Sequence, residues 1–269
     1  MDNFLELNPD HIRQMGDHLV EPSPTLSSMV VYTLVGSALG FQCYNSALNF
    51  VPAPAKYASE KRFKWRNVMT SFVHAIISGS IAVYCIVRYP ELRGDLIHSS
   101  AKLAEFLIAL SVGYFFYDGF DLLLFGTLQR AWPVLLHHGL VMGSFLYLLY
   151  HSYCTPCAVL ALLVEVNSVF LHGRQLLLMA GIEKSSAIFR VVRGANLVSF
   201  VVLRFGLITY FFAFMFVNRS ILYTRVLECM VPLIAAMAVI NVILFWRLLK
   251  SDVFQSKNGQ NQREVLVSN

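Results

Sequence analysis

The sequence is poor in charged residues. Asp, Glu, Lys and Arg make up 14% of its 269 residues, against about 25% in soluble domains. Hydrophobic residues make up 57% of the chain, and no polar segment of domain size separates the hydrophobic runs. The composition therefore excludes an ordinary soluble protein and predicts a single all-α, polytopic membrane helix bundle.

Other features that the sequence lacks exclude several kinds of ligand and cross-link. The net charge is +5, but no basic run is interleaved with stacking aromatics, so we expect no nucleic-acid partner. The five cysteines fall mostly inside hydrophobic runs and imply no disulfide framework. His, Cys and carboxylate residues occur as scattered pairs, whereas a zinc site needs three or four converging ligands. We therefore expect neither a metal nor a cofactor.

Seven hydrophobic runs have about the length that a membrane-spanning helix requires. They cover approximately residues 27–51, 67–88, 103–125, 133–150, 156–180, 195–217 and 226–249. The fourth run is the shortest, and a re-entrant fourth run would leave six spans. We expect a transmembrane domain over residues 27–250 and a disordered cytosolic tail over 251–269. Residues 1–26 are acidic and lack the basic start of a signal peptide, which predicts an extracellular tail.

The basic residues predict how the spans are oriented. Seven spans place 13 of the 21 Lys and Arg residues on one side and six on the other, with two inside the spans. Because short basic loops favour the cytosol, the N-terminus is expected outside and the C-terminus inside. The same topology puts the glycosylation sequon at Asn218 on the outer side, beside the membrane, where its use stays open.

Two acids lie close together on the third run. Asp118 and Asp121 are three residues apart, so both carboxylates should share one helix face. This pair could serve as acid and base in catalysis or bind a cation. The alternative is that the pair anchors the span near the cytosolic interface, with one or both acids reaching water.

The fourth run contains His137 and His138. Adjacent helical residues point about 100° apart, so the two imidazoles should face different neighbours. A histidine here can act as a base, a nucleophile or a metal ligand. The alternative is a pair of hydrogen-bonded packing residues, and the residue types alone do not distinguish these roles.

The fifth run carries a polar stripe. Glu165, Ser168 and His172 have spacings of three and four residues and therefore share a face. An ionisable group near mid-membrane is costly, so Glu165 should have a partner. Neighbouring helices offer the His pair, although its depth argues against contact, and Arg204 on the sixth run is a possible counter-ion unless it snorkels.

These residues resemble the TLC domain family, which includes the ceramide synthases. Ceramide synthases carry a His pair followed by an HDxSDxxLE segment, and the matching stretch here is VEVNSVFLH. Glu165 falls on the first acid, Ser168 replaces the second and His172 replaces the Glu. The acid and base set is therefore incomplete for acyl-CoA-dependent N-acylation.

The sequence is more similar to the branch of TLC domain-containing proteins 1 and 2. The resemblance covers residues 62–254, including KWRNVMTSFVHAIISG, SVGYFFYDGFDLL, HHGLVMGSF and RLLKSDVF. It implies a plasma-membrane protein, with the endoplasmic reticulum as the alternative. The implied role is to shape phospholipid acyl composition and fluidity by limiting incorporation of polyunsaturated chains.

Three hypotheses follow. The first is a cavity that binds a phospholipid or acyl chain, lined by the polar residues on the third to sixth runs, namely Asp118, Asp121, Glu165, Ser168, His172 and Arg204. The second is an acyltransferase that uses acyl-CoA, with His137 or His138 as its base or acyl acceptor. The third is a lipid sensor or adaptor without pocket chemistry. The first two require the buried acids and imidazoles to converge on one hollow.

Overall fold

The computed structural model describes residues 26–57, 61–126, 128–220, 222 and 224–251. Apart from Leu26 and Ser251, the two expected tails lie outside these residues. The described chain is helical and contains no strand. Its α-helices are α2 (Ser28–Ala47), α3 (Arg62–Arg88), α4 (Glu91–Gly94), α5 (Lys102–Phe125), α6 (Leu128–His151), α7 (Thr155–Leu162), α8 (Val164–Met179), α9 (Ala187–Ser199), α10 (Gly206–Val217) and α11 (Thr224–Leu249). The 3₁₀-helices η1 (Leu48–Phe50) and η2 (Ala55–Tyr57) and the π-helix η3 (Phe200–Phe205) complete the set.

Local chemistry explains where several helices begin. The Ser27 hydroxyl accepts a hydrogen bond from the backbone N–H of Val30 at 3.3 Å and caps α2. Ser186 caps α9 in the same way through Phe189 N–H. Pro156 lies in the first turn of α7, where its missing N–H would have no helical partner in any case.

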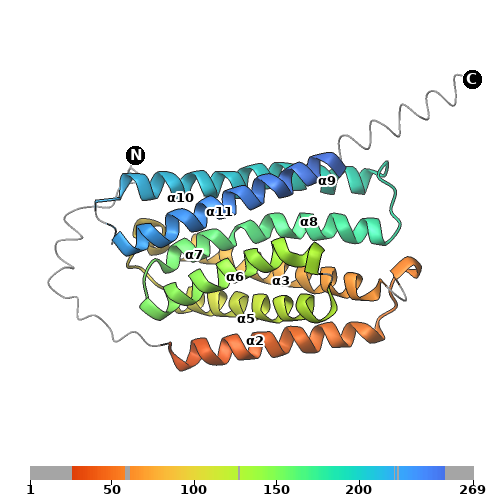
Figure 1. Ribbon diagram of the computed structural model, residues 1–269, viewed down its shortest axis with the longest axis horizontal. Helices are drawn as coiled ribbons and strands as arrows, with labels where there is room; N and C mark the ends of the chain where they lie inside the picture. Colours follow the sequence, from red (N-terminus) through yellow and green to blue (C-terminus); the bar gives the residue numbers. More distant parts are fainter. Residues whose placement is uncertain (1–25, 58–60, 127, 221, 223, 252–269) are drawn as a thin grey trace, which may run out of the picture.

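The long helices lie side by side, and the start of α2 and the end of α11 lie at opposite ends of the bundle (Figure 1). Six segments are long and apolar enough to cross a membrane: Arg62–Arg88, Lys102–Phe125, Ala131–His151, Thr155–Met179, Ala187–Val217 and Leu227–Leu249. The predicted multi-pass, all-α membrane bundle is therefore confirmed. The fourth hydrophobic run is among the six, so it is a full-length helix and not a short re-entrant one.

The one long described helix outside these six segments is α2, which is expected to be the first span. It is 20 residues long and packs along α5. The start of α2 and the end of α11 lie at opposite ends of the bundle, as an odd number of passes would require (Figure 1). The transmembrane domain expected over residues 27–250 stays a prediction.

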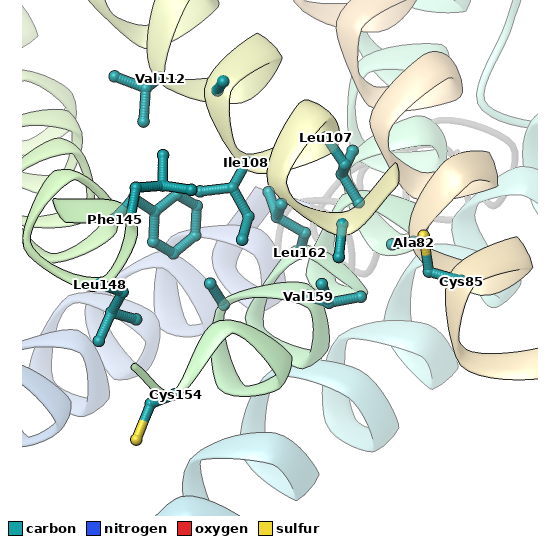
Figure 2. Close-up of a cluster of buried hydrophobic side chains, with 14 of the residues drawn as sticks. Ala82, Cys85, Leu107, Ile108, Val112, Phe145, Leu148, Cys154, Val159 and Leu162 are labelled. Atoms are coloured by element: carbon teal, nitrogen blue, oxygen red, sulfur yellow. The ribbon is translucent and has the colours of Figure 1, made fainter. Parts of the chain in front are cut away.

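The apolar core centres on α5. Of its most apolar 18 residues, 67% are buried, against 11% in α11. Figure 2 shows Leu107, Ile108 and Val112 of α5 facing side chains of α6 and α7, including Phe145 and Leu162. The bundle is therefore tight around α5, and α11 forms a peripheral wall.

Candidate functional site

A cavity of about 150 Å³ lies between α6, α7, α8, η3, α10 and α11, with Phe115 of α5 also in its wall. Its lining on α6 runs from His137 to Leu148, roughly 16 Å along the helix axis at 1.5 Å per residue. Most of the wall is apolar and shares Phe145, Leu148 and Leu162 with the core (Figure 2). The cavity is long and narrow, a shape that suits an extended chain better than a compact ligand.

Polar side chains gather at one end of this cavity. They are His137, Glu165, Arg204 and Asn241, each from a different helix, while Ser144 lines the wall about two turns further along α6. The opposite end, near the α6–α7 and α10–α11 connections, is walled by residues such as Leu148 and Met230. Glu165, Arg204 and Asn241 lie near the middle of their spans, and His137 lies about a third of the way along its own. The cavity therefore runs from mid-bundle toward one end of the molecule.

Arg204 organises the polar end. Its Nε donates to Asn167 Oδ1 at 2.7 Å, one terminal nitrogen donates to Asn241 Oδ1 at 3.1 Å, and the other donates to Ser168 Oγ at 3.0 Å. The guanidinium carbon also lies 5.2 Å from the centroid of the Phe200 ring. Arg204 is 7% exposed, so it does not snorkel to the surface, and its charge stays inside the bundle.

Two local features position this arginine. Arg204 lies in the π-helix η3, and π-helical turns inside α-helices frequently occur at functional sites. Asn167 is fully buried and donates to Asn196 and Ser199, which fixes its amide so that the oxygen faces Arg204.

Glu165 is held at the same end of the cavity. It is 8% exposed. Gly79 of α3 allows α8 to approach here, because a Cβ at Gly79 would lie 3.1 Å from Val166 N. Arg204 acts electrostatically on Glu165. Among the described side chains, however, Glu165 forms no ion pair within 4.0 Å.

The two adjacent histidines point to different places, as their 100° offset predicts. Their ring centroids are 5.7 Å apart. His137 lines the cavity, with Nδ1 3.2 Å from Met237 Sδ. His138 faces α5 instead, with Nδ1 3.4 Å from Asp118 Oδ2 and its ring centroid 4.9 Å from that of Phe115. Only one histidine of the pair therefore reaches the cavity.

The α5 acids belong to a second polar cluster. Asp118 Oδ1 accepts from Asn67 Nδ2 at 2.6 Å, and Asp121 Oδ1 accepts from Asn45 Nδ2 at 3.5 Å. The acids share one face, as predicted, and are 3% and 4% exposed, so neither is open to water. Neither lines the cavity. The expectation that all buried acids and imidazoles converge on one hollow is therefore corrected, because the set divides between the cavity and this cluster.

The remaining predicted residues divide in the same way. Ser168 bonds Arg204 without lining the cavity, and the half-buried His172 does not line it either. The sequence reasoning missed His74, which is 1% exposed and stacks on Tyr114 with ring centroids 3.8 Å apart. It also missed Asn241. The available signal was the same for both, a polar residue in the middle of a hydrophobic run.

The fold and site define a helical membrane protein with a polar-ended internal cavity, and the comparisons with known proteins identify the family. The model of the TLC domain matches residues 64–250, so the chain belongs to the TLC domain family. TLC domain proteins are membrane proteins involved in lipid metabolism or homeostasis.

Relatives extend this likeness over most of the chain. The sequence is 34% identical to TLC domain-containing protein 2 of Danio rerio over 240 residues, covering 89% of this chain and 96% of that protein. It is 30% identical to TLC domain-containing protein 1 of Homo sapiens over 234 residues, covering 85% and 92%. Human TLC domain-containing protein 2 is 31% identical over 225 residues, covering 82% and 83%. No solved structure matches the chain.

Proposed function

We propose that this protein regulates the acyl composition of phospholipids, and thereby the fluidity of the plasma membrane, by binding an acyl chain in the cavity. The proposed output is limited incorporation of polyunsaturated chains, the role implied by the resemblance to TLC domain-containing proteins 1 and 2. The observation that carries the proposal is a long apolar cavity with four polar groups at one end.

The size of the cavity limits what it can hold. A cavity of about 150 Å³ accommodates a molecule the size of benzene. It therefore takes part of one chain unless the peripheral helix α11 moves outward. Few α11 residues are buried, which makes α11 the wall whose movement would disturb the least packing.

The preference of the cavity for one acyl chain over another has to come from the shape of the cavity and from its polar end. Each buried methylene is worth about 0.8 kcal/mol when it leaves water, but a chain entering from the bilayer leaves an environment as apolar as the cavity wall. Apolar contact alone therefore gives little preference for the cavity over the surrounding lipid. The polar end and the width of the apolar part must discriminate one chain from another.

The proposal is tested by filling the cavity. Ala161 lines it, whereas Ala235 of α11 is exposed on the outer face. In cells that lack the endogenous gene, we expect wild type and Ala235→Phe to restore the phospholipid acyl profile and Ala161→Phe to fail. Lipid mass spectrometry measures the profile, with equal surface expression as the control. Restoration by Ala161→Phe would instead support an adaptor that does not use the cavity.

An acyltransferase is the second candidate, and the His138–Asp118 pair is the observation that favours it. A carboxylate beside an imidazole is the pairing that a general base or acyl acceptor requires, although His138 Nδ1 makes no hydrogen bond to Asp118 here. However, His138 does not line the cavity, and His137, which does, has no carboxylate within 4.0 Å among the described residues. Purified protein given labelled acyl-CoA should therefore transfer no acyl group. A hydroxylamine-sensitive adduct lost in His138→Ala would establish the enzyme.

A further inference from the structure

Arg204 has hydrogen-bonding capacity that the described protein does not use. A guanidinium has five N–H donors and stays charged at all physiological pH values. Three of these donors bond Asn167, Ser168 and Asn241. Two N–H groups therefore have no acceptor among the described residues, and the guanidinium lines the cavity.

The charge of Arg204 is also incompletely balanced. Its three bonded acceptors are amide and hydroxyl oxygens, which are neutral. No described carboxylate lies within 4.0 Å of it, Glu165 included. A buried charge inside a membrane is costly unless it is paired. The polar end of the cavity is thus a preformed site for one anionic group.

We infer that this site binds the carboxylate of an unesterified long-chain fatty acid, with the acyl chain along the apolar part of the cavity. The two unused Arg204 N–H groups would donate to the carboxylate oxygens. The inference rests on the proposed function and specifies its ligand.

The geometry favours a carboxylate over other lipid groups. A guanidinium matches a planar carboxylate, and charge-assisted bonds of this kind are about twice as strong as neutral ones. The cavity is narrow and its polar end is in the middle of the spans, so the entering head must be small. A phosphate that carries glycerol is bulkier, and the ester group of an intact phospholipid has no charge for Arg204.

The experiment compares two ligands with the same chain. Purified full-length protein in nanodiscs is titrated with radiolabelled oleate and with oleyl alcohol, which lacks the charge. We expect oleate to bind at least about 10-fold more tightly. In Arg204→Gln this preference should fall to about one, with binding of oleyl alcohol unchanged. Arg247→Gln, which removes an exposed arginine from α11, should keep the preference.

Two further variants separate folding from recognition. Arg204→Lys keeps a cation and should retain part of the preference for oleate over oleyl alcohol. This variant still tests the inference if Arg204→Gln fails to fold. Glu165→Gln should bind oleate at least as tightly as wild type, because it removes the internal anion nearest the site. Loss of oleate binding in Glu165→Gln would place recognition on Glu165 and overturn the assignment to Arg204.

The outcomes also separate this inference from the proposed function. Equal affinity of wild type for oleate and oleyl alcohol would overturn carboxylate recognition and leave the acyl-chain cavity standing. Stronger displacement of oleate by lysophosphatidic acid or oleoyl-CoA than by unlabelled oleate would assign the anion to a phosphate instead. If neither labelled ligand binds, both the inference and the acyl-chain cavity fail.

Discussion

Helices α2 and α5 approach each other closely at Gly113. An added Cβ there would overlap the carbonyl oxygen of Leu34 and lie 2.7 Å from Ser37 Cβ, well inside the contact distance of about 3.5–4.0 Å. Because these atoms belong to the backbone and Cβ of α2, they cannot rotate away, and Gly113→Ala must push the two helices apart. Overpacking of this kind costs about 1–3 kcal/mol.

Gly119→Ala on the same helix is the matched control. A Cβ at Gly119 meets Leu135 Cδ2 at 3.9 Å, an ordinary contact. Both variants gain the same helix propensity of about 1 kcal/mol, so that gain cancels in the comparison. Separation of α2 and α5 would also weaken the hydrogen bond from Ser37 Oγ to Leu110 O at 2.6 Å, worth about 1 kcal/mol.

Thermal unfolding in detergent, followed by tryptophan fluorescence, measures the difference. At about 2–4 °C per kcal/mol for a chain of this size, an overpacking cost of about 1–3 kcal/mol means that Gly113→Ala should unfold about 2–12 °C below Gly119→Ala. Equal unfolding temperatures would refute the docking of α2 on α5 and with it the expectation that α2 is a seventh pass.

Three further predictions concern the site, the outer surface and the topology. Asn167→Ala should lower the free energy of unfolding by about 1–3 kcal/mol, because it leaves Arg204 Nε without an acceptor. Thermal unfolding checks this, with Gln42→Ala, a change at an exposed residue, as the control. Asn218 should carry no glycan, because its side chain is 1% exposed and donates to Phe214 O at 2.9 Å, and a glycosidase-dependent mobility shift would contradict this. Epitope tags at the two ends of the chain should stain from opposite sides of the membrane, the N-terminal tag in intact cells and the C-terminal tag only after permeabilisation.

The positions of the helices could be predicted from the sequence. The hydrophobic run predicted at 133–150 corresponds to the observed helix Leu128–His151, and the run at 226–249 corresponds to Thr224–Leu249. A hydrophobic segment in lipid must satisfy its backbone hydrogen bonds internally, so about 20 apolar residues form a helix whatever their neighbours are. The break between α7 and α8 at Leu163 and the π-helix η3 have no comparable local signature.

The partners of the polar residues could not be predicted. The residue types were informative, since the predicted acids and Arg204 are all buried. Their grouping depends on which helices touch, and α2 and α3 contribute Asn45 and Asn67, which bond Asp121 and Asp118. These contacts join residues 51 and 76 positions apart. Close packing of whole helices sets such pairs, and no local spacing encodes it.

Photo-crosslinking tests the acyl-chain cavity most directly. Oleate carrying a diazirine midway along its chain is added to the purified protein in nanodiscs, and mass spectrometry locates the label. The cavity predicts labelling of lining residues such as Phe145 and Ile234, and loss of that labelling in Ala161→Phe but not in Ala235→Phe. Labelling confined to lipid-facing residues such as Val239 and Val242, and unchanged by Ala161→Phe, would contradict it.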